Sequence, residues 1–189
     1  MSSETMLSYS HGASATPLLG ETIGANLRRV AAAHPDAEVL VDVPASRRWT
    51  YAAFEAETDT LARGLIAAGL AAGDRVGIWA PNCAEWVQLQ YATAKAGIIL
   101  VNINPAYRVS ELQFTLNAVG VRALICATRF KSSDYIAMVE ALAPEIPGSE
   151  AGNLQLGGAP DLQSVIRIGG HARPGWHLFS EVQIGRAHV

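Results

Sequence analysis

The sequence predicts an α/β fold in which a parallel sheet carries helices on both faces. From Arg75 onward, four short apolar runs alternate with three stretches of helical periodicity. Each connection is long enough to contain a helix, which is what a crossover between parallel strands requires. Half of the 189 residues are apolar and 16% are charged, so the chain has ample material for a buried core.

The N-terminal part precedes this predicted sheet. Residues 1–20 are rich in Ser, Thr, Gly and Ala without periodicity, which predicts an extended arm. Thr22 is expected to cap a helix that ends before Pro35. The apolar positions of this helix have the i, i+4, i+7 spacing of one face: Ile23, Leu27 and Val30.

A hairpin and a second helix are expected next. Glu38–Val43 and Arg47–Thr50 have the composition of strands and flank a Pro-Ala-Ser turn. Thr50 is also the expected cap of a helix that Gly69 ends in the left-handed conformation. Trp49 is placed to form a hydrophobic staple with the first residue of the helix core face. The predicted core face holds Phe54, Thr58, Leu61, Leu65 and Ala68.

Arg75–Trp79 is predicted as the first strand of the parallel sheet. Asn82 is expected to cap the following helix, with Glu85 completing a capping box and Gly97 ending the helix. The run Ile98–Ile103 lacks polar alternation, which is typical of a strand buried on both faces. The helix between these two strands is expected to bury Val87, Tyr91 and Ala94, with Trp86 and Leu89 broadening the face.

A third helix of the sheet region is expected after the Asn104-Pro105 turn. Ser110 is its predicted cap, and Val109 with Phe114 is placed to form a staple. Gly120 ends this helix and Val121–Ala127 forms the next strand. The predicted core face holds Leu112, Leu116 and Val119.

The last predicted helix is capped by Ser132 or Ser133 and is stopped by Pro144. A loop rich in Gly, Pro and Asn follows up to about residue 160, and Ser164–Ile168 is predicted as the last strand. The core positions of this helix are Ile136, Val139 and Leu142.

Net charge, hydropathy and cysteine content indicate the kind of partner and the cellular compartment. The formal net charge is −3 without any basic block, so neither nucleic acid nor an anionic membrane is expected as a partner. The first residues lack the features of a secretory signal, and no apolar run is long enough for a transmembrane segment. Cys83 and Cys126 are expected to be reduced core thiols. These features predict a soluble, cytoplasmic protein.

A search for chemistry-bearing motifs finds no catalytic residue and no metal site. Phosphate-binding glycine loops are absent from the sequence, and Gly169-Gly170 is interpreted as a plain turn. His171 and His177 are interpreted as solvent-facing loop residues, since no third ligand lies near them. The acidic residues of the second helix are interpreted as a solvated face: Glu55, Glu57 and Asp59.

Ligands of open parallel sheets bind beyond the carboxyl ends of the strands. This rule predicts a ligand-facing rim made by three segments. They are Ala80-Pro81, Asn102–Tyr107 and Ala127–Phe130.

Two stretches resemble the N-terminal part of the acyl-adenylate-forming enzymes. They are RRWTYAAFEAETDTLARGL, which starts at Arg47, and GDRVGIWAPNCAEWVQLQYATAKAGIILVNINPAYRVSEL, which starts at Gly73. Within that superfamily they are similar to medium- and long-chain acyl-CoA synthetases, also called fatty acid–CoA ligases, and the arm sequence SYSHGASATPLLGETIG supports this branch. The resemblance extends from about Ser8 to Ile168, and the matched motifs are structural ones.

The resemblance implies the first subdomain of the adenylate-forming fold. It also implies that the parent enzyme uses ATP and Mg²⁺ to convert a fatty acid to an acyl-adenylate, from which coenzyme A takes the acyl group. The family's phosphate loop, adenine and ribose segments and catalytic lysine have no counterpart in these 189 residues. We therefore expect the chain as given to be an inactive fragment that binds none of these small molecules tightly.

A division of the chain into three segments follows from this interpretation. Residues 1–20 are the arm, residues 21–182 are a partial AMP-binding domain, and residues 183–189 are a tail of sequence that departs from the family pattern. This tail, Gln183–Val189, is expected to be non-native or truncated sequence.

The resemblance offers one candidate binding residue. Arg108 follows the Asn104-Pro105 turn at the rim, where some relatives carry basic residues near the phosphates of coenzyme A. The alternatives for the chain are a fragment of another adenylating enzyme, one that activates an aryl acid or an amino acid, and a non-catalytic α/β binding module.

Overall fold

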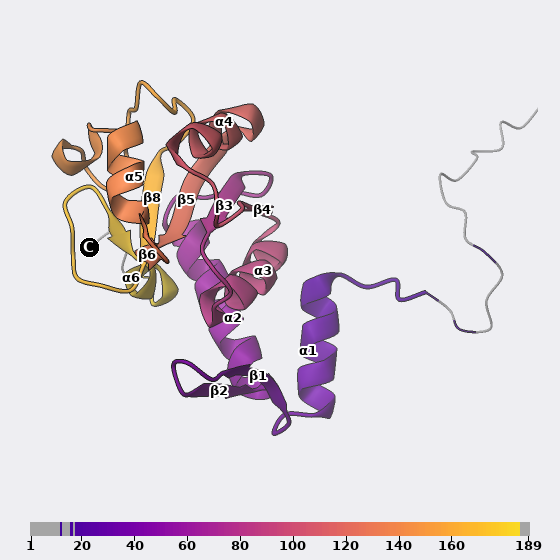
Figure 1. The fold of residues 1–189 in the computed structure, drawn as a ribbon. Coiled ribbons are helices and arrows are strands. Elements are labelled where there is room, and N and C mark those ends of the chain that lie inside the picture. Colours follow the sequence, from indigo (N-terminus) through magenta and orange to yellow (C-terminus); the bar gives the residue numbers. More distant parts are fainter. Residues whose placement is uncertain (1–11, 13–15, 17, 186–189) are drawn as a thin grey trace, which may run out of the picture.

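A five-stranded parallel sheet forms the centre of the molecule (Figure 1). The computed structural model describes residue 12, residue 16 and residues 18–185. The strand order is β4-β3-β5-β8-β9, and every pairing in this sheet is parallel, so the predicted architecture is confirmed. The strands are β3 (Arg75–Trp79), β4 (Ile99–Asn102), β5 (Val121–Ala127), β8 (Ser164–Ile168) and β9 (His177–Leu178).

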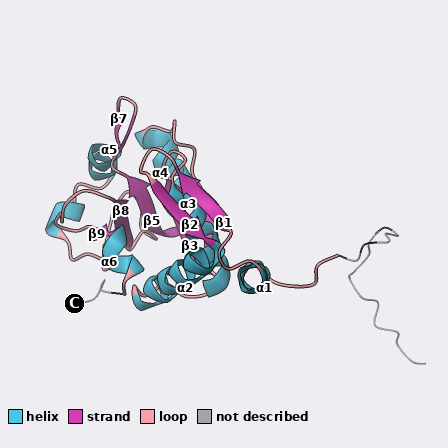
Figure 2. Ribbon diagram, turned by 90° about the horizontal axis from the view of Figure 1, so that it is seen from below, coloured by secondary structure: helices cyan, strands magenta, loops and turns pink. Residues whose placement is uncertain are grey.

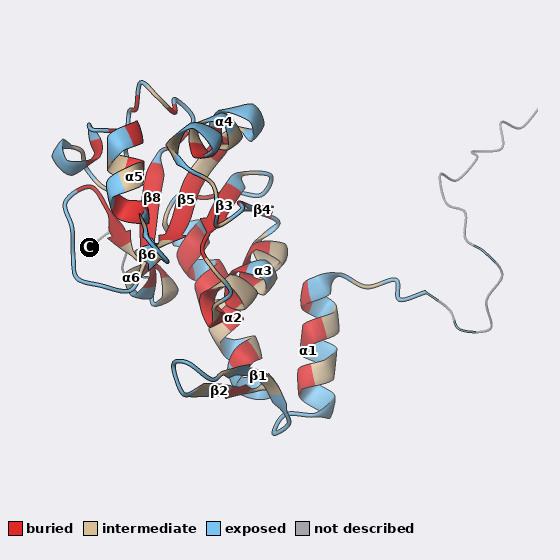
Figure 3. Ribbon diagram, viewed as in Figure 1, coloured by how far each residue is buried: buried red, intermediate tan, exposed pale blue. Residues whose placement is uncertain are grey.

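Helices cover both faces of the sheet (Figure 2). One face packs against α2 (Tyr51–Ala67), α3 (Ala84–Ala96) and α6 (Phe179–Gln183). The other face packs against α4 (Val109–Val119) and α5 (Tyr135–Leu142). Successive side chains of a strand point to opposite faces, and each central strand therefore contributes to both cores. Figure 3 shows the central strands as almost entirely buried.

The chain after β8 differs from the prediction. Ser164–Ile168 was expected as the last strand, but β9 and α6 follow it. Phe179 and Val182 of α6 are buried against α2, because Gly64 of α2 lets the backbone approach closely. A Cβ atom at Gly64 would lie 1.8 Å from the carbonyl oxygen of Val182. Thus Gln183 ends a packed helix, while residues 186–189 of the predicted tail lie outside the described residues.

The N-terminal unit consists of α1 (Ile23–Ala33) and the antiparallel hairpin of β1 (Glu38–Asp42) and β2 (Arg47–Thr50). Both predicted threonine caps are confirmed: Thr22 accepts from the Ala25 amide at 3.1 Å, and Thr50 caps α2. Most of the predicted arm, residues 1–11, 13–15 and 17, lies outside the described residues.

The buried face of α1 is rotated from the predicted one. Ile23 is 55% exposed, whereas Gly24, Leu27 and Ala31 are buried. A Cβ atom at Gly24 would lie 2.9 Å from the Cγ atom of Lys95, so the small residue lets α1 approach α3 at this position. The close contact, which the apolar periodicity does not reveal, sets the rotation of the helix.

The start and the buried face of α3 also differ from the prediction. The cap position is Cys83 rather than Asn82, and the Glu85 carboxylate binds Arg47, Oε1 to Nη1 at 2.7 Å, instead of closing a capping box. The buried residues of the helix include Gln88, Leu89, Ala92 and Thr93, of which Leu89 and Ala92 belong to the core on the sheet. The predicted face of Val87, Tyr91 and Ala94 is half-buried; its first two residues lie against the N-terminal unit, whose cluster includes Leu27, Trp49 and Phe54.

Helix α4 begins one residue before the predicted cap. Arg108 occupies the cap position, and its amide donates to Oε2 of Glu111 at 3.0 Å, so Ser110 does not cap the helix. Phe114 is 75% exposed and makes no staple. Leu112 and Leu116 are buried as predicted, but Val119 is exposed at the end of the helix.

Helix α5 is capped by Asp134 instead of a serine. The Ala137 amide donates to Oδ1 of Asp134 at 3.0 Å. The helix begins at Tyr135, so Asp134 directly precedes it and both serines lie farther upstream. This stretch forms a small unpredicted hairpin, β6 (Arg129–Phe130) paired with β7 (Ser133–Asp134). The 3₁₀ turn η1 (Ile146–Gly148) lies in the loop after this helix.

Strand β4 lies at the edge of the sheet. It was expected to be buried on both faces, but Ile99 is 48% exposed and its neighbours are half-buried. Within residues 18–185 the strand pairs with β3 alone, since the chain crosses over to place β5 on the far side of β3. The apolar run Ile98–Ile103 therefore belongs to an edge strand.

Candidate functional site

The three predicted rim segments lie at the carboxyl edge of the sheet, and a stacked pair of rings beside them holds the middle segment. Trp79, at the end of β3, stacks on Tyr135, with ring centroids 3.8 Å apart and planes inclined by 15°. The indole Nε1 of Trp79 donates to the carbonyl of Asn104 at 3.1 Å, and the hydroxyl of Tyr135 donates to the carbonyl of Pro105. Two buried aromatic donors therefore fix the turn that follows β4.

The turn between Asn104 and Tyr107 is also ordered from within. Oδ1 of Asn104 accepts from the Ala106 amide at 2.9 Å, which is the geometry of an Asx turn. Burial raises the pKa of Tyr135 to about 12, so its hydroxyl remains a donor at neutral pH. The rim turn thus has a defined conformation without any ligand.

Arg108 lies on the exposed rim beside this turn. Its Nη1 donates to Oγ of Ser133 at 2.7 Å, which links the start of α4 to the β6–β7 hairpin. No ion pair involves Arg108 within the described part of the chain. The guanidinium is therefore placed to meet an anionic group at the rim, while its role in binding coenzyme A stays a prediction.

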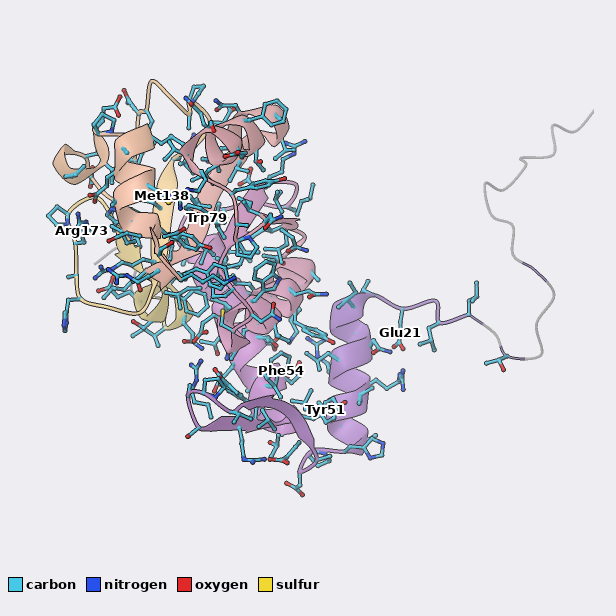
Figure 4. The ribbon with its side chains drawn as sticks, in the orientation of Figure 1. Glu21, Tyr51, Phe54, Trp79, Met138 and Arg173 are labelled. Carbon is cyan, nitrogen blue, oxygen red and sulfur yellow. The ribbon has the colours of Figure 1, made fainter. Side chains whose placement is uncertain are left out.

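A cavity of about 350 Å³ opens at the carboxyl ends of β5 and β8, next to α5. We call it the arginine cavity. Arg173 lines its outer side. Nε of Arg173 donates to Oε1 of Glu140 at 2.6 Å, and the indole of Trp176 donates to the same oxygen at 3.1 Å. Figure 4 labels Arg173 at the outer edge of the molecule, on the side where α5 lies. The lining residues are Thr128, Arg129, Asp134, Ile136, Ala137, Glu140, Arg167 and Arg173.

Sequence reasoning missed this cavity although it named one of its borders. Ala127–Phe130 was predicted as rim, but Arg167 and Arg173 come from β8 and from the loop after it. One signal was present in the sequence: Arg167 interrupts the apolar strand SVIRI, where a charge is out of pattern.

The interactions of Glu140 lower the pKa of its carboxyl group. The guanidinium of Arg173 and the indole of Trp176 hold the pKa of the Glu140 carboxyl below its usual range, against the opposing effect of burial. Glu140 is therefore ionised at neutral pH and neutralises Arg173.

The acidic residues of α2 do not form a solvated face, contrary to the prediction. Lys95 of α3 donates from Nζ to Asp59 at 2.7 Å, to Glu55 at 3.3 Å and to Oγ1 of Thr58 at 2.9 Å. Glu57 accepts from the indole of Trp49 and from the Gln88 amide, each at 2.8 Å. These carboxylates were misassigned because their partners lie on other elements, β2 and α3, and those on α3 are more than 30 residues away in the sequence.

The two histidines differ in burial, and so do the two cysteines. His171 is exposed as predicted, but His177 is buried in β9, so the interpretation of both as solvent-facing was wrong. Cys126 is fully buried and Cys83 is half-buried, and both are free thiols. Burial raises the pKa of the Cys83 thiol to about 11 and that of Cys126 still further, so neither is ionised at neutral pH.

Two searches over the described residues gave no site. No group of three His, Cys, Asp or Glu side chains in this part of the chain could hold a metal ion. None of its helices combines the length and the apolar character that a bilayer crossing requires.

Comparison with known proteins gave a family match and close relatives. The family model described as "AMP-binding enzyme" matches residues 27–164. The medium-chain acyl-CoA ligase ACSF2, mitochondrial, of Danio rerio is 42% identical over 175 residues, covering 93% of this chain and 29% of the relative. Its counterpart in Homo sapiens is 40% identical, covering 93% of this chain and 28% of the relative.

A solved structure agrees with these relatives. The N-terminal domain of FACL13 from Mycobacterium tuberculosis is 28% identical, with a TM-score of 0.64, covering 78% of this chain and 34% of that one. The chain therefore spans less than a third of the length of the curated relatives that it matches.

Proposed function

The chain belongs to the AMP-binding enzyme family, and from this premise we propose that it forms part of a medium-chain acyl-CoA ligase. Such an enzyme joins a fatty acid to coenzyme A at the expense of ATP. The observation that carries the proposal is the 42% identity to a medium-chain acyl-CoA ligase along 93% of the chain.

The chemistry of the proposed reaction explains why ATP is needed. A carboxylate is a poor electrophile. When its oxygen attacks the α-phosphorus of ATP, pyrophosphate leaves and the product is an acyl-adenylate, a mixed anhydride in which AMP is a good leaving group. The thiol of coenzyme A then attacks the acyl carbon, AMP leaves, and the thioester remains. Mg²⁺, if present as proposed, would neutralise charge on the triphosphate.

The described residues would supply a scaffold and a ligand-facing rim to this reaction. Trp79 and Tyr135 hold the turn at Asn104-Pro105, and the turn places Arg108 at the edge where parallel sheets bind ligands. An exposed guanidinium suits a phosphate group, because it donates in a planar fork. We propose that Arg108 contacts a phosphate of coenzyme A, and that the adenylation chemistry rests on other parts of the ligase.

The cellular location belongs to the proposal as well. Composition predicts the cytoplasm, whereas the relatives are named as mitochondrial. Fractionation of cells that carry the tagged chain would decide between the two compartments.

A chimera tests the proposed function. Residues 22–168 would replace the aligned segment of the Danio rerio ligase, and octanoyl-CoA formation would be measured with and without ATP. We expect a folded chimera to form octanoyl-CoA only when ATP, Mg²⁺ and coenzyme A are all present. Circular dichroism and thermal unfolding would establish that the chimera is folded.

Two outcomes would contradict the proposal. A chimera that is as stable as its parent yet forms no acyl-CoA would show that this scaffold does not serve a ligase, which favours a non-catalytic module. A chimera that turns over benzoate or an amino acid in preference to octanoate would favour another adenylating enzyme.

A further inference from the structure

We propose that the arginine cavity binds a small oxyanion, a phosphate or carboxylate group, through the guanidinium of Arg167. The site would hold such a group whether or not the chain takes part in acyl activation. Three features of the structure carry the proposal: the burial of an uncompensated charge, the charge balance of the cavity walls, and the packing of Gly170.

Arg167 is a buried cation without a counter-ion. It lies in β8 and is only 8% exposed, and its Nε has no hydrogen-bond partner. No ion pair within the described residues includes it. Burial of an ionised group is costly unless the group is paired, so this arrangement favours an anion that enters the cavity.

The other charged residues of the cavity are already matched in pairs. Arg173 and Glu140 form a two-point ion pair, and Arg129 lies 3.9 Å from the carboxylate of Asp134. Three arginines and two carboxylates line the cavity, and Arg167 is the positive charge left over. The walls therefore present one unneutralised charge to whatever enters.

Gly170 packs against the guanidinium of Arg167 and so sets its orientation. A Cβ atom at this residue would lie 3.1 Å from Cζ of Arg167 and 3.2 Å from both Nη atoms. Nearly equal distances to the three atoms mean that the flat face of the guanidinium rests on the glycine. The N–H donors lie in the plane of the group, so this packing covers the face and leaves the donor edge for hydrogen bonding.

The size of the cavity suits a small group. Its volume of about 350 Å³ is at the low end of ligand pockets. Arginine recognises phosphate and carboxylate through paired N–H donors, and both groups fit such a space. Gly169-Gly170, interpreted from the sequence as a plain turn, would then shape a side-chain anion site instead of a backbone phosphate cradle.

The 189-residue chain itself can test the proposal. Inorganic phosphate and acetate would be titrated separately, with sodium chloride holding the ionic strength constant, and binding would be followed by calorimetry and by thermal unfolding. Wild type is expected to bind at least one of the two with a saturable rise in Tm. Arg167→Met should weaken that affinity about tenfold or more, because it removes a charge-assisted hydrogen-bond donor.

The control is Arg63→Met, which removes an exposed arginine of α2 outside the cavity and should bind as the wild type does. Gly170→Ala is a second variant: its methyl group should displace the guanidinium and weaken binding while Arg167 remains. Because Gly170 has a φ of +79°, alanine is strained there, and thermal unfolding without added anion must first establish that this variant is folded. Saturation by phosphate alone would assign a phosphoryl group, and saturation by acetate alone a carboxylate. Absence of saturable binding by both, or equal binding by wild type and Arg167→Met, would overturn the proposal.

Discussion

Two cations of this molecule have largely buried side chains, and their surroundings are opposite. The side chain of Lys95 is 7% exposed and meets two carboxylates, a hydroxyl and a backbone carbonyl. Arg167 as a whole residue is 8% exposed, and no carboxylate of the described residues forms an ion pair with it. The first charge is matched by α2, whereas the second faces a cavity.

The difference separates a structural role from a binding role. Lys95 joins α3 to the acidic side of α2, and Arg28 of α1 approaches the same carboxylates, with Nε 3.5 Å from Glu55. Breaking such a buried cluster leaves unpaired charges behind. An unmatched cation has no partner to lose, so its removal should cost little stability and should instead change what the protein binds.

Lys95→Met should produce the largest effect. We expect the free energy of unfolding to fall by about 2–4 kcal/mol, because Glu55 and Asp59 lose their shared counter-ion in a partly buried position. Urea denaturation measures it. The matched control is the other lysine of the chain, Lys131→Met, an exposed residue whose loss should change stability by less than about 0.5 kcal/mol. Equal effects of the two substitutions would contradict a structural role for Lys95.

Glu140→Gln should have an intermediate effect, about 1–2 kcal/mol at pH 7, because the ion pair with Arg173 is partly exposed. The pKa of Glu140 is lower in the folded chain than its ordinary value of 4.5. Its contribution is therefore full above about pH 4.5 and is lost as the pH falls through the folded-state pKa. The stability gap to wild type should narrow in acid.

Urea denaturation at pH 7 and in acid measures this gap. Glu38→Gln, which removes an exposed pair with Arg48, serves as the control and should change little at either pH. A gap for Glu140→Gln that stays constant with pH would argue against the ion pair. The same variant frees Arg173 beside Arg167, so phosphate or acetate should bind it more tightly than the wild type.

Arg167→Met should change stability by less than about 1 kcal/mol in the absence of added anion, and the sign is expected to favour the variant. An apolar side chain of similar length removes a buried unpaired charge without leaving a carboxylate unmatched. Urea denaturation in a buffer free of phosphate and carboxylate measures this. A loss as large as that of Lys95→Met would mean that Arg167 is structural, and the contrast between the two cations would disappear.

Arg108→Ala should have the smallest effect on stability, within about 0.5 kcal/mol, because its one bond to Ser133 is exposed. In the chimeric ligase it should raise the KM for coenzyme A while the KM for ATP stays constant. Arg63→Ala is the matched control. An unchanged KM for coenzyme A would leave Arg108 as a surface arginine.

Local sequence patterns predicted most helices and strands correctly, because capping residues and glycines mark the ends of the helices. Thr22 and Thr50 cap their helices, and Gly97 and Gly120 end theirs in the left-handed conformation. Where several candidate caps lie together, the choice depends on tertiary contacts. Glu85 cannot complete a capping box because Arg47 holds its carboxylate.

Other errors share one cause, which is that partners lie far apart in the sequence. The apolar run of β4 gave no indication that β5 would cross to the other side of β3 and leave β4 at an edge. The rim followed from the succession of strands and helices, whereas Arg108 was named because of the resemblance to acyl-CoA synthetases. The arginine cavity did not, since Arg129, Arg167 and Arg173 meet only when β5 and β8 pair.

The contact between Gly64 and Val182 has a consequence for how the chain folds during synthesis. It joins two backbone positions separated by 182 − 64 = 118 residues, and a contact of such long range forms late. The apolar side of α2 that receives Phe179 and Val182 stays uncovered until α6 has left the ribosome. Release of the nascent chain before that point would expose this surface, and a chaperone that binds apolar segments would have its longest opportunity there.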